Sequence, residues 1–170
     1  MVTTSDAFPH VGGLREYVAD GIPIYALDLN LPLLERIVAA PRKAFPDKME
    51  RNPRRPIFRK VSSKTTVGSG PNRLEIYPVR TETGERMMMV YFPELRLLYS
   101  SDLVQKLPNG SFFSPQYLSE VMNAVDREKL TVDNVFAMHT ERIRWSEVTD
   151  AVAKQSAPPE ALRSQIIKLI

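Results

Sequence analysis

The first part of the chain alternates between helical and strand-like spacing of its apolar residues. Leu14, Tyr17 and Val18 recur at i, i+3 and i+4, which is the spacing of one helix face, and Gly21 supplies a C-terminal stop. The apolar run at 22–27 is too short for a helix and is typical of a buried strand. We therefore predict a helix that ends near residue 20, followed by a buried strand.

A second helix is predicted where four apolar residues share one face. Asn30 is a favourable N-cap, and Pro32 suits the first turn because its missing N–H is not needed there. The apolar stripe consists of Leu33, Leu34, Ile37 and Val38. Pro41 cannot continue the helix and ends it.

The rest of the chain predicts several strands and three more helices. Strands are expected at 57–61, 64–67, 74–79 and 135–138, with a tight pair at 86–92 and 95–100 joined by Pro93-Glu94. Three helices are expected: one after Ser114-Pro115, one starting near Ser146 and one at 159–170. The core face of the first consists of Leu118, Val121, Met122 and Val125. Helices that alternate with short buried strands favour a layered α/β domain.

Composition adds limits to this picture. With 170 residues, 43% of them apolar, the chain is long enough for one domain with a buried core. It has no cysteine, so disulfides, thiol nucleophiles and cysteine-bound zinc are excluded. Residues 1–16 lack a signal pattern, and the densest apolar run, 87–92, is far shorter than a membrane span. We expect no membrane association and a cytoplasmic location.

The small net charge of +3 hides a basic, proline-rich segment at 41–64. Residues 42–64 hold nine Lys or Arg against two acids, a net +7, which leaves the rest of the chain at −4. Such a block could contact phosphate. It also contains Pro46, Pro53 and Pro56 but no aromatic series for base stacking, so we favour a solvated connector over nucleic-acid binding.

Three stretches of the sequence, taken in order, resemble the metallo-β-lactamase superfamily. The first stretch, 4–15, has a threonine where the family's metal motif begins. Near its end, two glycines lead into a helix. The second, 88–103, is similar to the family's strand pair and ends near Asp102. The third, 135–139, resembles the strand that delivers the last metal histidine and ends at His139. Each stretch alone is a weak signal, but the ordered set is fairly specific.

The resemblance implies an α/β fold of the αββα sandwich type, formed by a single domain over residues 1–170 that lacks the family's first strands. Several strands precede the metal motif in that family, whereas here the motif position begins at Ser5. The N-terminal sheet would then expose an edge or an apolar face. We expect a second copy or another chain to cover it, which makes a homo-oligomer the leading expectation. A fragment of a longer protein would explain the same feature.

Most of the metal ligands implied by the resemblance are replaced in this chain. The replacements are Ser5, Ala7 and Pro9 in the first motif and Thr83 ahead of the strand pair. They remove every histidine of the family's first metal site, and Pro9 stands where the family has an aspartate that binds the second metal and helps in proton transfer. The residues that remain, His10, Asp102 and His139, match most of the second metal site.

These three residues carry the candidate chemistry. The chain has only two histidines, and both fall on ligand positions of the family. Two imidazoles and one carboxylate could hold one divalent ion, zinc being the first choice, with positions left open for water. The alternative is structural: His10 near a helix N-terminus, Asp102 as a turn or capping residue, and His139 as a half-buried side chain.

Three functions remain open. The first is a non-catalytic relative that acts by associating with itself or with a full-length relative. The second is a one-metal hydrolase that uses His10, Asp102 and His139. The third is nucleic-acid or anion binding through residues 42–64. The sequence does not indicate a substrate, because the fold hosts several chemistries.

Overall fold

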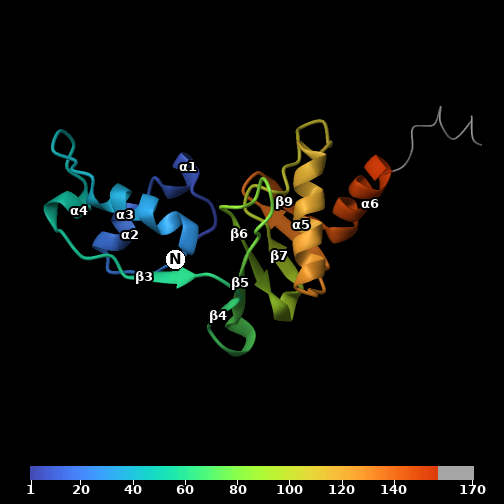
Figure 1. Cartoon of the computed structure of the whole chain (residues 1–170), viewed down its shortest axis with the longest axis horizontal. Helices are drawn as coiled ribbons and strands as arrows, with labels where there is room; N and C mark the ends of the chain where they lie inside the picture. The colour runs from blue at the N-terminus through green and yellow to red at the C-terminus, as the bar shows by residue number, and fades with distance from the viewer. Residues whose placement is uncertain (157–170) are drawn as a thin grey trace, which may run out of the picture.

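Helices cover both outer sides of the molecule and enclose two sheets (Figure 1). The structure, a computed structural model, describes residues 1–156, so the helix expected at 159–170 lies outside the described residues. The described residues form a three-stranded sheet, mainly from the first third of the chain, and a six-stranded sheet from the remainder. This α/β arrangement confirms the predicted fold class.

The three-stranded sheet is parallel throughout. It has the order β1 (Val2–Thr3), β2 (Ile24–Leu27) and β3 (Phe58–Val61). Parallel neighbours need crossover connections, and helices supply them. The crossovers contain α1 (Phe8–Val11) and α2 (Leu14–Ala19), then α3 (Leu31–Ala39) and α4 (Lys48–Arg51). The buried strand predicted at 22–27 is therefore β2.

Both predicted N-terminal helices exist, with two differences in their details. Tyr17, placed on the core face of the first helix by its spacing, is 43% exposed, and Leu14 and Val18 make the buried face instead. Asn30 precedes α3 as expected, but its side chain does not cap that helix. Its Nδ2 instead donates to the carbonyl oxygen of Arg86, 2.9 Å away in the other half of the molecule.

The six strands of the larger sheet follow chain order. The strands that precede Asp102 and His139 therefore lie side by side. Its strands are β4 (Thr65–Val67), β5 (Leu74–Pro78), β6 (Met88–Phe92), β7 (Leu97–Tyr99), β8 (Asn134–Ala137) and β9 (Thr140–Arg144). All neighbours are antiparallel except β7 and β8, which are joined by the helix α5 (Pro115–Arg127). A second helix, α6 (Trp145–Ser156), follows β9.

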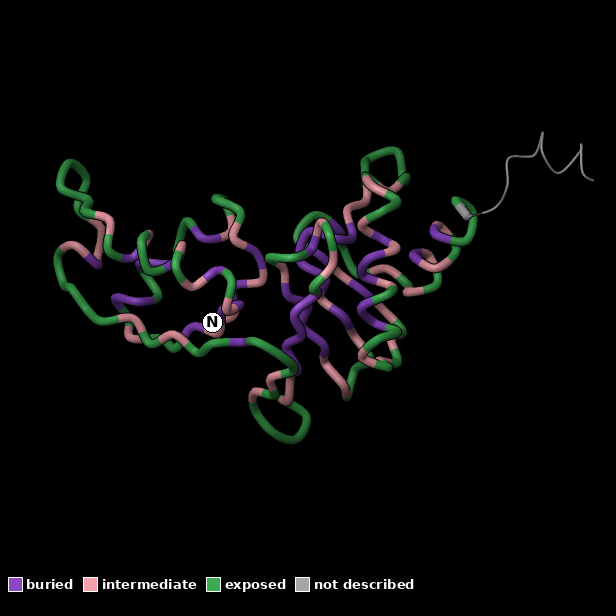
Figure 2. The backbone as a smooth tube through the Cα atoms, in the orientation of Figure 1, coloured by how far each residue is buried: buried purple, intermediate pink, exposed green. Residues whose placement is uncertain are grey.

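The apolar face of α5 packs on the six-stranded sheet, as its spacing predicted. Leu118 and Val121 are fully buried and Val125 nearly so, while Met122 is half-buried. They share one core with Met89 and other residues of the sheet. Figure 2 shows the buried residues concentrated in the strands and in the helix face turned toward them.

The predicted strand pair is β6 and β7, whereas β9 and α4 were not predicted. A 3-10 turn at Pro93–Leu95 joins β6 to β7. Strand β9 is mostly exposed and carries charged residues such as Glu141 and Arg142, so it has no apolar signature. Helix α4 spans only four residues. Neither element buries enough apolar surface to produce a recognisable pattern.

A small apolar cluster and a backbone hydrogen bond help to join the two sheets. Leu27 and Val61 from the parallel sheet pack with Ile76 and Met88 from the six-stranded sheet, and all four side chains are fully buried. The backbone N–H of Met88 donates to the carbonyl oxygen of Thr4 at 2.9 Å. The segment after β1 is thereby held against the six-stranded sheet, where it carries the first site residue.

Candidate metal centre

Three segments that are distant in the sequence bring His10, Asp102 and His139 together. His10 lies on α1, Asp102 lies in the turn after β7, and His139 lies between β8 and β9. His10 Nδ1 is 3.1 Å from Asp102 Oδ2, and His139 Nε2 is 3.6 Å from Asp102 Oδ1. One ligand atom from each residue lies within 4.8 Å of the other two, so the three could hold one metal ion.

Ser101 connects all three segments through its backbone and side chain. Its hydroxyl lies 3.2 Å from the carbonyl oxygen and 3.1 Å from the hydroxyl of Thr4, and it donates to the segment that leads to His10. Its carbonyl oxygen accepts from the backbone N–H of Met138 at 3.0 Å, next to His139. Ser101 has a φ of 55°, the left-handed region, which turns the chain sharply just before Asp102. We name this arrangement the Ser101 clamp.

The replaced ligand positions serve other purposes or carry no ligand atom. Ser5 is buried, and its Oγ accepts from the backbone N–H of Ala7 at 3.1 Å, so it stabilises the loop before α1. Thr83 donates from its hydroxyl to Glu120 on α5 at 2.6 Å. Ala7 and Pro9 have no side-chain donor atom for a metal. The four positions therefore do not rebuild the family's first metal site.

Glu120 was not recognised from the sequence, because a lone glutamate on a helix gives no signal. Its carboxylate is buried and accepts from the Thr81 and Thr83 hydroxyls and from the backbone N–H of Gly84. Burial raises the pKa of this carboxyl, but these hydrogen bonds outweigh burial and leave the pKa below its usual value. Glu120 fixes the loop between β5 and β6 and takes no part in the candidate site.

The carboxylate of Asp102 is buried and incompletely paired, which is the strongest sign that the site takes a cation. Asp102 is 8% exposed, and its Oδ1 has no hydrogen-bond donor among residues 1–156. His10 Nδ1 likewise makes no hydrogen bond within the described chain, although it faces Oδ2. A buried charge without full pairing is costly. A metal ion among the three side chains would satisfy both orphaned atoms, so the donor set fits such an ion.

His139 is the exposed member of the cluster. The side chain of His139 is 57% exposed, whereas those of His10 and Asp102 are 15% and 11% exposed. Solvent therefore reaches the cluster past His139. Three protein ligands on an ion that takes four or more leave room for water on this side.

An apolar groove of about 390 Å³ runs from the metal-ligand cluster across one face of the six-stranded sheet. It is lined by Val2 and Thr3 of β1, the adjacent Thr4, His10, and Leu74, Val90, Phe92, Tyr99, Phe136 and Met138 of the larger sheet and its turns. Burial raises the pKa of the Tyr99 hydroxyl above its usual value. We call this feature the sheet-face groove. No sequence pattern indicated this groove, because its walls come from segments that lie far apart in the chain.

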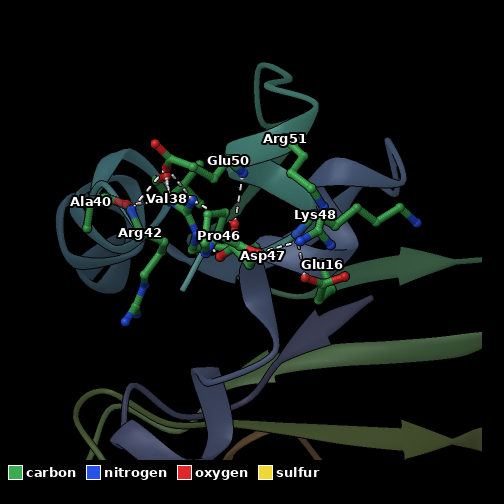
Figure 3. Close-up of polar contacts among 10 residues, drawn as sticks. Glu16, Val38, Ala40, Arg42, Pro46, Asp47, Lys48, Glu50 and Arg51 are labelled. Atoms are coloured by element: carbon green, nitrogen blue, oxygen red, sulfur yellow. Dashed lines mark hydrogen bonds and ion pairs between the residues drawn. The ribbon is translucent and has the colours of Figure 1, made fainter. Parts of the chain in front are cut away.

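Arg15 holds the first half of the basic segment against the N-terminal half of the molecule, and Figure 3 shows the polar cluster that contains its partners Val38, Ala40 and Asp47. Arg15 is 5% exposed and donates from Nε and Nη2 to Asp47 at 2.5 Å and 3.0 Å. It also donates to the carbonyl oxygens of Val38 and Ala40. These contacts lower the pKa of Asp47 to about 2, chiefly through the Arg15 hydrogen bond. The segment at 41–64 thus contains α4 and β3 and is not simply a solvated connector.

Nucleic-acid binding by the basic segment stays a prediction. Arg54 and Arg55 are exposed, as are Arg59 and Lys60 on β3. Other cations of the segment are engaged within it or with its surroundings. Arg51 donates to the carbonyl oxygen of Pro46, Lys48 pairs with Asp20, and Lys64 pairs with Glu75.

Solved structures of the metallo-β-lactamase fold resemble this chain over most of its length. The metallo-β-lactamase from Pontibacter korlensis is 17% identical with a TM-score of 0.59, and the match covers 92% of this chain and 68% of that one. A flavodiiron core from Synechocystis sp. PCC6803 is 11% identical with a TM-score of 0.64, covering 92% and 43%. The rubredoxin oxygen:oxidoreductase from Desulfovibrio gigas is 15% identical with a TM-score of 0.59, covering 90% and 42%.

These comparisons establish the fold of the chain. It has the metallo-β-lactamase fold, as the three sequence stretches indicated, and at these identities the likeness extends no further. The chain spans about two-thirds of the β-lactamase length and less than half of the flavodiiron length. No protein-family model and no curated protein matches the sequence.

Within residues 1–156, no helix is both long enough and apolar enough to cross a membrane.

Proposed function

We propose that this protein binds one divalent metal ion, zinc in the first instance, through His10, Asp102 and His139, and that it acts as a one-metal hydrolase. The observation that carries the proposal is the buried Asp102 carboxylate, which faces two imidazoles and has an oxygen without a hydrogen-bond donor in the described chain. The sequence alone favoured a non-catalytic relative. The convergence of three ligand atoms supports the one-metal alternative better.

Each residue has a definable part in this site. Asp102 supplies the anionic oxygen, held in place because the Ser101 clamp fixes its turn against both histidine-bearing segments. His10 and His139 supply nitrogen donors, the former enclosed and the latter at the solvent opening. A divalent metal bound here would supply a water with a pKa lowered to about 7, which provides hydroxide near neutral pH.

The same geometry argues against the two-metal hydrolysis of the fold family. Ser5 and Thr83 are engaged in hydrogen bonds of their own, and Ala7 and Pro9 offer no ligand atom. We therefore expect a stoichiometry of one metal ion per chain. Proton transfer by the motif aspartate is also lost, because Pro9 stands in its position.

Metal analysis of tag-free protein tests the proposal. We expect one equivalent of zinc after equilibration and gel filtration, and its loss in His139→Ala and Asp102→Asn. Asp133→Asn is the matched control, because Asp133 is an exposed aspartate whose carboxylate pairs only with Arg96 within residues 1–156. Retention of zinc by Asp102→Asn, or a metal-free wild-type protein, would contradict the metal site.

Hydrolysis of simple activated esters then separates a hydrolase from a metal-binding protein without activity. The zinc-loaded wild type is expected to hydrolyse p-nitrophenyl esters faster than the chelator-treated protein, and Asp133→Asn is expected to match it. Equal rates with and without zinc would refute the catalytic part of the proposal and leave metal binding standing.

A further inference from the structure

A pocket of about 230 Å³, separate from the sheet-face groove, lies between α1 and α3. Figure 1 shows both helices on the same side of the three-stranded sheet. The apolar part of the lining comes from Phe8 and Val11 of α1, Ile37 of α3 and Ala40. We call this feature the α1–α3 pocket. An engineered apolar cavity of about 150 Å³ holds benzene, so the pocket has room for one aromatic ring and a small polar group.

The charged residues of the α1–α3 pocket are all positive. Among the residues that the structure describes, Arg15, Arg36 and Arg42 line the pocket and no Asp or Glu does. Arg15 is buried and already paired with Asp47, so it has little capacity left for a ligand. Arg36 and Arg42 are therefore the two groups that a ligand can use.

The guanidinium groups of Arg36 and Arg42 are free to meet a ligand. Both residues are exposed, and neither guanidinium makes a hydrogen bond or ion pair within residues 1–156. The backbone N–H of Arg42 donates to Glu50 Oε2 at 3.0 Å, but the Arg42 side chain extends away from Glu50 and Asp47 (Figure 3). The pKa of Asp47 is lowered chiefly by its hydrogen bond from Arg15, and the charge of Arg42 adds only a smaller effect. Two unpaired cations beside an apolar wall produce a positive potential that attracts an anion.

Phe8 adds an aromatic surface that the chain itself leaves uncovered. Its side chain is 81% exposed, although it lines the pocket. A flat apolar ligand that packs against this ring would remove apolar surface of both partners from water, which is favourable. An anion that carries an aromatic ring therefore matches both the apolar and the charged part of the lining.

We propose that the α1–α3 pocket binds a small aromatic carboxylate, with its ring against Phe8 and Ile37 and its carboxylate on Arg36 and Arg42. The planar guanidinium group pairs with both oxygens of a carboxylate, which makes this contact strong and directional. Inorganic phosphate would leave the apolar lining unused, and a neutral aromatic compound would leave the arginines without a partner. Both cations belong to the lining of one small pocket, so a compact molecule fits better than an acidic peptide with charges spread along a chain.

The inference does not depend on the proposed metal function. None of the three candidate metal ligands lines the α1–α3 pocket. Helix α1 contributes to both features, since Phe8 and Val11 line the pocket whereas His10 faces Asp102. A ligand in this pocket would therefore occupy a site separate from the candidate metal centre.

A proton–nitrogen NMR titration of the protein as purified tests the inference with phenylacetate, its neutral amide phenylacetamide and the ringless anion acetate. Phenylacetate is expected to shift the amide signals of residues 8–12 and 36–42 in a saturable way. Its affinity should exceed those of phenylacetamide and acetate by about tenfold or more, because each of these lacks one half of the recognised chemistry. Arg36→Met and Arg42→Met, which keep the apolar stem of the side chain, should each weaken phenylacetate binding about tenfold.

Three variants serve as controls. Arg55→Met removes an exposed positive charge that does not line the pocket, and it should bind phenylacetate within about twofold of wild type. Asp102→Asn should also match the wild type, which excludes capture of the carboxylate by the proposed metal. Ile37→Ala should weaken binding about fivefold, whereas Leu33→Ala, at a half-buried position of α3 outside the pocket, should not. If Ile37→Ala fails to fold, the arginine variants still decide the question, because both arginines are exposed.

Several results would overturn the inference. These are phenylacetamide binding as tight as phenylacetate binding, Arg36→Met and Arg42→Met affinities no weaker than that of Arg55→Met, or signal changes centred outside residues 8–12 and 36–42. An acidic peptide that requires both arginines, combined with no phenylacetate binding at millimolar concentration, would overturn it as well. Phenylacetate binding by a wild type that takes up no zinc would refute the proposed function and support the inference.

Discussion

The metal site predicts an unusual response of stability to the substitution Asp102→Asn. If Asp102 exists to hold a cation, the metal-free protein carries a buried carboxylate whose Oδ1 lacks a donor within residues 1–156. An unsatisfied buried polar atom costs about 1–3 kcal/mol, and more when it is charged. Replacing the carboxylate by a neutral amide removes that charge with little change in shape. The metal-free Asp102→Asn protein should therefore be as stable as the wild type or more stable, by up to about 3 kcal/mol.

Zinc should reverse this order. A ligand that binds only the folded state at 100 times its dissociation constant stabilises it by about 2.7 kcal/mol. For a chain of this size, each kcal/mol corresponds to roughly 2–4 °C in the melting temperature. The wild type should gain about 5–11 °C from zinc, whereas Asp102→Asn should gain none. Thermal unfolding followed by circular dichroism, with and without chelator at pH 8, measures both effects.

A structural role for Asp102 would give the opposite result. As a turn or capping residue it would stabilise the fold by itself, and Asp102→Asn would lower the melting temperature of the metal-free protein. Its backbone carbonyl accepts from Gln105 Nε2 at 2.9 Å, a contact that the substitution leaves in place. Asp133→Asn serves as the control, with a change expected within about 0.5 kcal/mol. Destabilised metal-free Asp102→Asn protein would refute the reasoning.

The other predictions concern the small half of the molecule and the state of association. Arg15→Met should lower the free energy of unfolding by about 2–4 kcal/mol, because it leaves Asp47 and the carbonyl oxygens of Val38 and Ala40 without their buried donor. The control Arg36→Met, on the exposed side of α3, should change this free energy by under about 0.5 kcal/mol. Urea titrations measure both changes. The pKa of Asp47 is about 2 in the folded protein against an ordinary value of 3.8, so its contribution to stability is complete above pH 3.8 and is lost as the pH falls through about 2. In an acid titration, Asp47→Asn should therefore lose stability less steeply below pH 4 than the wild type. Parallel curves would contradict this. Sedimentation at micromolar concentration tests the expected homo-oligomer, and a monomer across that range would remove it.

Much of the architecture was predictable because it depends on local patterns. The run that became β2, the strand pair β6 and β7, and the helix α5 each combine a clear apolar period with a recognisable turn or cap. Strand β9 and helix α4 escaped prediction because charged or very short elements carry little periodicity. Tyr17 was misplaced because helical spacing alone does not fix how wide a buried face is.

The candidate site was predictable only through the family resemblance. The positions of His10, Asp102 and His139 within the ordered stretches suggested that they converge, and the structure brings them together. The Ser101 clamp was not predictable, since its hydrogen bonds join residues 97 positions apart in the chain. The sheet-face groove was equally hidden, because its walls are assembled from separate strands.

The most direct test of the metal site is a crystal structure of the zinc-loaded protein with anomalous data at the zinc edge. We expect one anomalous peak per chain, about 2.0–2.2 Å from a nitrogen of His10, a nitrogen of His139 and an oxygen of Asp102, with water completing the coordination. A peak bound by other residues, or electron density that shows the three side chains unliganded in zinc-saturated crystals, would contradict the account.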